Sequence, residues 1–285
     1  MNKLNYLVIV PLTKNQLIYQ NNRIITIPII NKAKINSTLK NFILEKKLKL
    51  KSSFKKLPIK TINGSDYHAI TFLTNPTKNK SLSCKRIEKI SVEFLAPYDQ
   101  ILCESIAIFN LPFNSYRKKV FFYGGSFNPL HKGHIECVRQ FPFKKDLVVV
   151  PDYNPFKMKP KFRNIFQNYQ SLLKAFSKFN VSIYSGFYGL TKPNPTYIWL
   201  KKIKAGKIGL VMGDDNFLTI EKWYKANHLL KKIESLYVIP RVYNIHDILA
   251  HKAQLTLKFT RLKIFILKEH SYQNLSSTAI RKKKL

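Results

Sequence analysis

Short apolar runs alternate with helical patterns over the second part of the chain, from residue 119 onward. Over residues 165–176 the apolar positions recur at three- and four-residue steps, which predicts a helix with one buried face. Strands that alternate with helices in this way are typical of βαβ units and a parallel sheet. The runs expected to form its strands are Val120–Tyr123, Asp146–Val150, Val181–Tyr184, Lys207–Met212, Ser235–Ile239 and Leu262–Leu267.

The first 118 residues show a different pattern, with no catalytic motif and no internal repeat. A lysine-rich stretch from Thr38 to Lys56 favours a helix. The short apolar runs around it are Tyr6–Val10, Ile24–Ile30, Ala69–Leu73 and Ile101–Phe109. We therefore predict an N-terminal α+β region of uncertain fold and unknown role, 1–118, and an α/β catalytic domain, 119–285. The boundary is expected in the polar, turn-prone segment 112–119.

The apolar start of the chain, Leu4–Leu12, ends at a proline and a leucine and has no small-residue cleavage site, so it favours a strand over a signal peptide. No stretch approaches the roughly 18 apolar residues that a membrane helix needs. The three cysteines, Cys84, Cys103 and Cys137, have no CxxC spacing, which argues against a zinc site and a disulfide framework. A reduced, cytoplasmic protein is the expectation.

Charge is the unusual feature of the composition. The 285 residues hold 50 Lys and Arg against 15 Asp and Glu, a formal net charge of +35. Such a field attracts polyanions, from nucleic acid to ATP. Because both regions share the excess, two interpretations stay open: a lysine-rich composition with a solvated surface, or a nucleic-acid partner.

The most informative segment is Gly124–His134, GGSFNPLHKGH, which directly follows the first expected strand of the α/β domain. Parallel sheets bind ligands at the carboxyl ends of their strands, and the glycines allow a sharp turn and a close approach to a ligand. A helix that begins near His131 points its amide groups at an anion. His131 and His134 share a face of that helix, where imidazoles can donate hydrogen bonds to phosphate oxygens. The segment predicts phosphoryl or nucleotidyl transfer.

This string resembles the (S/T)-F-(N/D)-P-x-H-x-G-H signature of the nucleotidyltransferase superfamily. A second string near the end of the chain, Leu275–Arg281 (LSSTAIR), is similar to the I-S-(S/A)-T-x-I-R motif of pyridine-nucleotide adenylyltransferases. The resemblance implies a Rossmann-like parallel sheet of the nucleotidyltransferase type in 119–285. It also implies adenylyl transfer from ATP with release of pyrophosphate.

Three further features narrow the resemblance to the bacterial type of nicotinate-nucleotide adenylyltransferase. Gly213–Asp215 resembles the family's G-x-D after the fourth strand, and Trp223–Tyr224 resembles its W-Y segment, which packs on the nicotinate ring. The loop with Lys157 follows the second strand as the family's does, although Phe156 stands where the family usually has His. Thr196 fits the family's Y-T-x-x-T-L element, with Trp199 where a second Thr is usual.

The resemblance assigns a role to each matching residue. His131 and His134 are the expected catalytic residues, and Mg²⁺ is expected to be held mainly by the phosphates of ATP, with no protein-made metal site. The residues expected to bind ATP are Gly125, Ser126, Phe127, His131, Gly133, His134, Gly213, Asp215, Ser277, Thr278 and Arg281. Those expected to bind the acceptor, nicotinate mononucleotide, are Lys157, Thr196, Trp223 and Tyr224.

Three alternatives stay open at this point. The acceptor could be nicotinamide mononucleotide, since the Trp-Tyr pair favours the acid only weakly, or pantetheine phosphate, which lacks the pyridine ring that this pair suits. From another class, the chain could be a nucleic-acid-binding or regulatory protein built on the same fold. The sequence defines neither the oligomeric state nor the job of residues 1–118. The short stretch after Arg281, where the family continues through a helical segment, could change activity or assembly.

Overall fold

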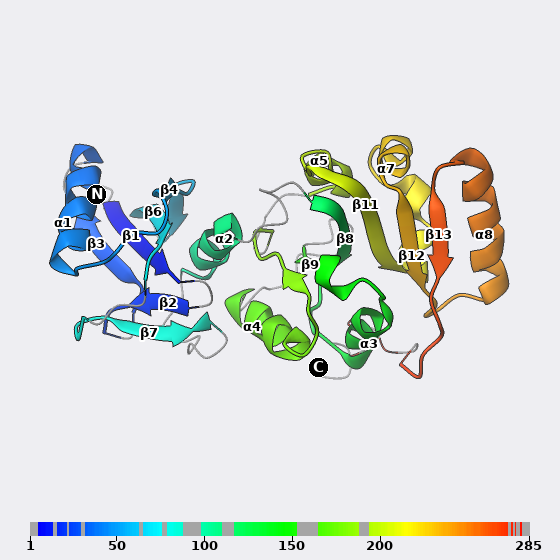
Figure 1. Cartoon of the computed structure of the whole chain (residues 1–285), viewed down its shortest axis with the longest axis horizontal. Coiled ribbons are helices and arrows are strands. Elements are labelled where there is room, and N and C mark those ends of the chain that lie inside the picture. The colour runs from blue at the N-terminus through cyan, green and yellow to red at the C-terminus, as the bar shows by residue number, and fades with distance from the viewer. Residues whose placement is uncertain are drawn as a thin grey trace. The chain divides into compact units, whose positions relative to one another are not determined.

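The computed structural model describes residues 5–13, 16–21, 23–29, 32–62, 65–75, 79–87, 98–109, 117–152, 165–187 and 194–272, with 275, 277 and 280. The chain divides into two compact units (Figure 1). Unit 1 comprises Met1–Phe109 with Arg163–Gln170, and unit 2 comprises Asn110–Phe162 with Ser171–Leu285. Residues 110–116, which include most of the predicted boundary, lie outside the described residues.

Unit 1 contains a mixed sheet in the order β4-β6-β1-β2-β7, with β3 also paired to β1 and β5 to β6. Its strands are β1 (Asn5–Leu12), β2 (Gln16–Tyr19), β3 (Ile25–Ile29), β4 (Lys55–Lys56), β5 (Lys60–Ile62), β6 (Ser65–Leu73) and β7 (Ser83–Arg86). Its helices are the short 3₁₀ helix η1 (Lys32–Lys34), α1 (Ile35–Glu45) and α2 (Asp99–Phe109). The pair β1–β6 is parallel and the other pairs are antiparallel. The α+β expectation for this region is confirmed.

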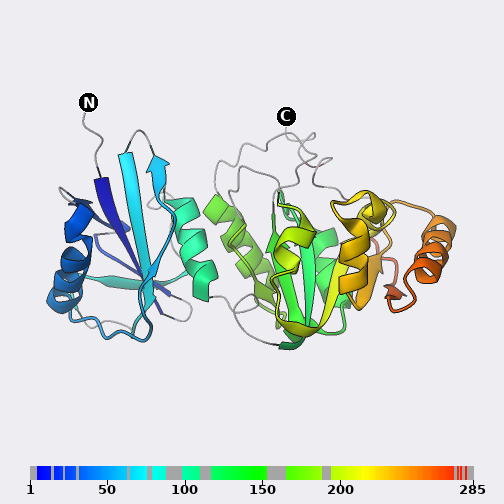
Figure 2. The same cartoon turned by 90° about the horizontal axis from the view of Figure 1, so that it is seen from above.

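Helices cover both faces of this sheet, because its central strands β1 and β6 are apolar on both sides. Leu7 and Ile9 of β1 pack in one core with Leu39 and Phe42 of α1. Figure 2 shows α2 against the opposite face from α1. The apolar start of the chain is therefore a central strand, as its sequence predicts.

The predicted helix from Thr38 to Lys56 is wrong in its second half. Helix α1 ends at Glu45, and Lys47 adopts a left-handed backbone with φ 51°. The following segment joins the sheet instead: the Lys51 N–H donates to Leu73 O, and β4 pairs with β6. Pairing with the sheet edge outweighs the local helical pattern, which no short window of sequence reveals.

Unit 2 contains six parallel strands in the order β10-β9-β8-β11-β12-β13. They are β8 (Arg117–Gly125), β9 (Leu147–Pro151), β10 (Ser182–Ile183), β11 (Ala205–Gly213), β12 (Ser235–Ile239) and β13 (Lys263–Ile266). Each falls on one of the six runs predicted from the sequence. The predicted Rossmann-like parallel sheet is therefore confirmed.

The strand order reverses between β8 and β11, the two neighbours at the centre of the sheet. Tyr123 pairs with Val211, two residues before the end of each strand, so both strands end at the same level. Helix α3 (Lys132–Gln140) follows β8 on one face of the sheet, and helix α7 (Ala226–Lys232), which comes after β11, lies on the other (Figure 1). In open parallel sheets this reversal leaves a crevice at the carboxyl ends of the strands, where ligands bind.

Helices α5, α7 and α8 pack in one continuous core with the sheet of unit 2. The helices that follow β8 are α3 (Lys132–Gln140), η4 (Lys144–Asp146), α4 (Ile165–Phe176), α5 (Thr196–Leu200), α6 (Asp214–Phe217), η5 (Ile220–Lys222), α7 (Ala226–Lys232) and α8 (Ile245–Lys258). Helix α4 coincides with the predicted helix, and Phe166, Tyr169, Leu172 and Phe176 are buried as its pattern requires. Among the described residues, no helix is both long and apolar enough to cross a membrane.

Candidate active site

The glycine loop begins at the carboxyl end of β8, where Gly124 and Gly125 close the strand. Phe127 follows with a left-handed backbone, φ 46°, and its ring is buried against Tyr123 and His134, with ring centroids 5.3 and 5.0 Å away. A Cβ on Gly125 would lie 3.1 Å from the Phe127 ring. The loop therefore folds tightly over its own aromatic side chain, and the Phe127 ring packs against the ring of His134.

His131 and His134 lie at the start of α3, as the sequence predicts. His131 is the N-cap residue and His134 is the third residue of the helix. Their rings stack with centroids 3.7 Å apart, and both side chains are more than nine-tenths buried. The His131 N–H donates to Nδ1 of His134 at 3.3 Å, so the proton of a neutral His134 ring is on Nε2. This tautomer makes His134 a hydrogen-bond donor on its outer edge.

The backbone N–H of His134 approaches the His131 side chain in a capping-box arrangement, but neither ring nitrogen of His131 has a well-formed hydrogen bond with a described residue. Burial, with the positive charge of Arg241 and the nearby His270, lowers the pKa of His131 from 6.5 to about 4. A Cβ on Gly133 would lie 3.1 Å from its Nδ1, so Gly133 leaves the room that the imidazole occupies. A buried polar side chain without a partner is costly and points to a ligand that supplies one.

Arg241 enters the site from the end of β12, and the sequence analysis gave it no role. Its loop is held by Asp214, a fully buried carboxylate. Asp214 Oδ2 accepts from the N–H groups of Arg241, Val242 and Tyr243 at 2.7, 2.7 and 2.9 Å, and Oδ1 accepts from Asp215 N–H at 2.8 Å. Asp214 thus ties the end of β11 to the loop after β12 and fixes the backbone that carries Arg241.

Asp215, the residue matched to ribose binding, is exposed at the start of α6. A Cβ on Gly213 would lie 2.6 Å from Asp215 Oδ1 and 3.6 Å from Arg241 Nη1, so both side chains approach this glycine. The structure therefore separates two neighbouring aspartates. The carboxylate of Asp214 accepts backbone N–H groups, whereas the side chain of Asp215 is exposed to solvent. Ribose binding by Asp215 stays a prediction.

Contacts of Leu275 and Ser277 bring the second sequence signature to the glycine loop and to Arg241. Ser277 Oγ donates to Pro129 O at 2.9 Å, and Arg241 Nη2 donates to Leu275 O at 2.9 Å. The carbonyl of Tyr272 would lie 3.3 Å from a Cβ on Gly133. Of the predicted phosphate-binding residues, Lys157, Thr278 and Arg281 lie outside the described residues.

The elements predicted to bind the acceptor also meet. Thr196 begins α5, and the next residue, Tyr197, packs against His228 of α7 with ring centroids 5.8 Å apart. Lys225 Nζ lies 5.7 Å from the Tyr224 ring centroid and 6.0 Å from that of Tyr197. Trp223 is half-buried against the core of unit 2, and Tyr224 is half-exposed. The sequence analysis missed Lys225, which adds a cation beside this aromatic group.

Trp199 explains one departure from the family pattern. Its ring is buried and packs edge-on against Phe122, with centroids 5.1 Å apart, and against Phe187 at 5.6 Å. It is therefore a core residue of unit 2, where it replaces the hydroxyl that the family usually has. The second departure, Phe156, lies outside the described residues.

Among the described residues, no three His, Cys, Asp or Glu side chains come together to hold an ion. Both oxygens of Asp214 already accept backbone N–H groups, which leaves Asp215 as the neighbouring exposed carboxylate. A divalent ion here would take most of its oxygen ligands from a bound phosphate and water.

The lowered pKa of His131 predicts how stability depends on pH. The folded protein holds the imidazole proton of His131 less tightly than the unfolded chain does. The stabilisation linked to this group is therefore fully present above pH 6.5 and is lost as the pH falls towards 4. A pKa of 6.5 unfolded and about 4 folded corresponds to about 3 kcal/mol. We expect His131→Asn to lack this loss in urea denaturation between pH 7 and pH 4. If the free energy of unfolding of wild type and variant fell in parallel with pH, the lowered pKa of His131 would be contradicted.

The family model described as cytidylyltransferase-like matches residues 122–283. A protein of Helicobacter pylori (strain HPAG1), named a probable nicotinate-nucleotide adenylyltransferase, is 36% identical over 135 residues, which cover 44% of this chain and 76% of that protein. A protein of the same name from Aliarcobacter butzleri (strain RM4018) is 33% identical, over 41% of this chain and 68% of its own length. Another, from Caldicellulosiruptor bescii, is 28% identical over 58% of this chain and 85% of its length.

Proposed function

Since the chain belongs to the cytidylyltransferase-like family, we propose that it transfers the adenylyl group of ATP to nicotinate mononucleotide. The products are deamido-NAD and pyrophosphate, in NAD biosynthesis. The relatives named nicotinate-nucleotide adenylyltransferase support this choice of acceptor within the family. A cytoplasmic location, expected from the cysteine content, is part of the same proposal.

The observation that carries the proposal is the pair of stacked, buried histidines at the start of α3. They lie at the reversal of strand order, where parallel sheets bind nucleotides. Neither ring nitrogen of His131 has a partner among the described residues, and one of the two carries the N–H of the neutral ring. The buried Nε–H of Arg241 also lacks an acceptor there. Unpartnered donors around a helix N-terminus fit a polyphosphate, whose oxygens accept from several directions.

In the proposed reaction, the 5′-phosphate oxygen of the mononucleotide attacks the α-phosphorus of ATP in line. The bond between the α-phosphorus and the bridging oxygen breaks, and the electron pair leaves with pyrophosphate. His134 Nε2–H donates to an α-phosphate oxygen, where negative charge grows in the transition state. His131, Arg281 and Arg241 hold the triphosphate, and Lys157 steers the anionic acceptor. No protein nucleophile is needed, because positioning and charge neutralisation lower the barrier.

Mg²⁺ enters the proposal as an ion bound mainly by the phosphates of ATP. It would neutralise phosphate charge and help orient the leaving pyrophosphate. Asp215 is the described carboxylate best placed to face such a complex, because Asp214 is used by the backbone. Metal selectivity would then follow the nucleotide complex, since the protein offers no dedicated set of ligands among its described residues.

Pyrophosphate release, followed separately with nicotinate and nicotinamide mononucleotides, tests both the reaction and the acceptor. The cation of Lys225 beside the Tyr224 ring favours an acceptor that carries a carboxylate. A hydrogen bond to a charged group contributes about 1.5–3 kcal/mol, so we expect kcat/KM to be about 10- to 100-fold higher for the acid. No release with either compound would refute adenylyl transfer, and equal use of both would refute the choice of acceptor.

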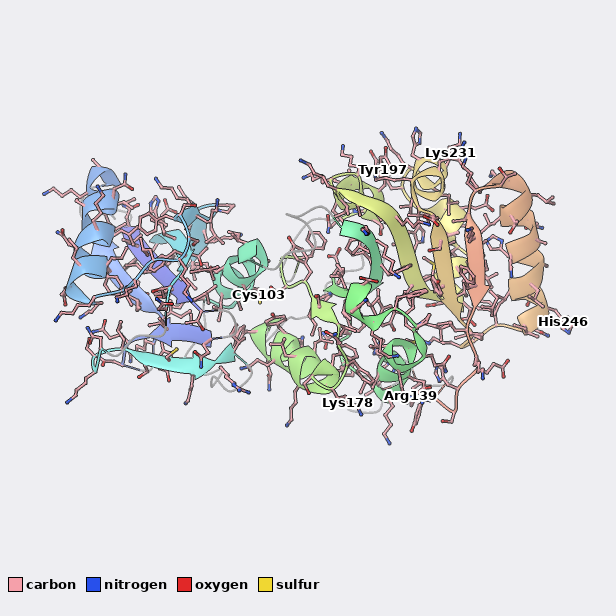
Figure 3. All side chains as sticks on the ribbon, viewed as in Figure 1. Cys103, Arg139, Lys178, Tyr197, Lys231 and His246 are labelled. Atoms are coloured by element: carbon pink, nitrogen blue, oxygen red, sulfur yellow. The ribbon has the colours of Figure 1, made fainter. Side chains whose placement is uncertain are left out.

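The distribution of positive charge supports an enzyme over a nucleic-acid-binding protein. Lys178 and Lys231 lie on opposite sides of unit 2 (Figure 3), and exposed lysines also line unit 1 over residues 47–56. A groove that follows a nucleic-acid backbone would gather its cations along one path. Most of the net charge of +35 therefore fits a solvated, lysine-rich surface that also attracts anionic substrates.

A further inference from the structure

His270 lies in the segment that follows β13, outside both sequence signatures. Its Nδ1 accepts the N–H of Tyr272 at 3.1 Å, which leaves the ring proton of the neutral side chain on Nε2. Nε2 is buried and has no hydrogen-bond partner among the described residues. The side chain is thus a fixed donor whose N–H is not used by any described residue.

The surroundings of His270 are those of the phosphate site. His270 is close enough to His131 and Arg241 for their charges to interact, and the carbonyl of Tyr272 lies over Gly133. The buried nitrogens of these three side chains that lack a hydrogen-bond partner among the described residues are His131 Nδ1 and Nε2, Arg241 Nε and His270 Nε2. With both imidazoles neutral they carry three N–H groups, because one nitrogen of His131 is an acceptor. A neutral ligand with a single acceptor atom would leave most of these donors unpaired.

The carboxylate that interacts electrostatically with His270, Glu136, is already paired with other donors. Glu136 of α3 already accepts from Arg139 Nε at 2.7 Å and Nη2 at 2.5 Å, and from Gln140 Nε2 at 3.1 Å. Arg139 balances the charge of Glu136, so an anion can approach His270 without facing an unpaired carboxylate. Glu136 is thus occupied by Arg139 and Gln140, and His270 Nε2 makes no hydrogen bond to it.

We propose that His270 is a further binding residue for the triphosphate of ATP, donating Nε2–H to a phosphate oxygen beside His131 and Arg241. This inference rests on the proposed function for the identity of the nucleotide. Since Tyr272 N–H holds the ring and the carbonyl of Tyr272 covers Gly133, the contact also fastens the segment 270–272 over the bound phosphates. His270 thus couples nucleotide binding to the position of residues 270–272.

Two substitutions separate this role from a purely structural one. His270→Asn keeps an acceptor at the position of Nδ1 for Tyr272 N–H but removes the distal donor, whereas His270→Gln places an amide N–H near Nε2. With the full chain, we expect His270→Asn to raise KM for ATP about 10- to 100-fold with little change in kcat, and His270→Gln to recover most of the loss. Wild-type KM in His270→Asn would overturn the proposal.

A matched control is His251, whose Nε2 is also buried without a partner among the described residues but whose ring packs on Phe217. His251→Asn should leave KM for ATP unchanged. If it raised KM as much as His270→Asn, loss of any buried imidazole would explain the effect and the proposal would fail.

Binding measurements separate this inference from the proposed function. Calorimetry with inorganic tripolyphosphate should show affinity about 10- to 100-fold weaker for His270→Asn than for wild type. Tripolyphosphate should also slow hydrogen exchange of the Tyr272 amide in wild type and not in His270→Asn. This result would stand even if no pyrophosphate were released with nicotinate mononucleotide. Equal tripolyphosphate affinity in both proteins, with wild-type adenylyl transfer intact, would overturn the His270 inference alone.

Discussion

His134→Ala is expected to lower kcat for pyrophosphate release about 10²- to 10³-fold, with a smaller change in KM for ATP. The reason is the orientation of the ring. The backbone N–H of His131 fixes Nδ1 of His134 as an acceptor, so the ring N–H of neutral His134 is Nε2–H, which we expect to donate to the charge that develops at the α-phosphate. A donor whose bond strengthens only in the transition state contributes mainly to kcat.

His134→Asn is the matched variant for this prediction. Its amide oxygen can accept the His131 N–H as Nδ1 does, while the distal donor is removed. We expect His134→Asn to be as slow as His134→Ala, with its melting temperature closer to that of wild type. Undiminished turnover in either variant would contradict the role given to His134. A loss that followed the melting temperature instead would indicate that the ring mainly supports Phe127.

The sheet of unit 2 could be predicted because its strands are buried on both faces. A central parallel strand such as β9, LVVVP, reads as an unbroken apolar run, which remains visible in a single sequence. Once the strands are placed, the site follows, because loops after the strands meet at one edge. The position of His131 and His134 at that edge is therefore a consequence of local sequence and sheet direction.

The groups that complete the site could not be predicted, because they depend on contacts between distant segments. The W-Y resemblance reaches Arg241 only as the end of a strand, and His270 lies outside every motif. Their relation to His131 appears only once the loop after β12 and the segment after β13 take their places beside α3. Arg241 had one weak signal, its position directly after a strand end. His270 had none, since a lone histidine beyond the last strand has no preferred partner in the sequence.

The Gly213–Asp215 string shows the same limit within three residues. The motif resemblance favours Asp215, which is exposed, and gives no role to Asp214, which is fully buried. Which carboxylate turns inward depends on the N–H groups that the loop after β12 presents, and these lie 27 to 29 residues away. The sequence shows two neighbouring aspartates, and only the fold shows that Asp214 has a structural role.

Asp214→Ala is expected to reduce the free energy of unfolding by about 3–5 kcal/mol, because it leaves the N–H groups of residues 215 and 241–243 without their acceptor. Asp214→Asn keeps the shape but offers one acceptor oxygen to N–H groups that need two, so we expect an intermediate loss. Urea denaturation measures both.

The neighbouring aspartate provides the control that makes the Asp214 prediction specific. Asp215→Asn should change stability by less than about 0.5 kcal/mol, because its side chain is exposed. If Asp215 binds ribose, that variant should instead raise KM for ATP in a protein of normal stability. Asp214→Asn should instead lose stability, and its activity should fall as a consequence, because the backbone of Arg241 is no longer held in place. Equal stability of the two Asn variants would refute the structural role of Asp214.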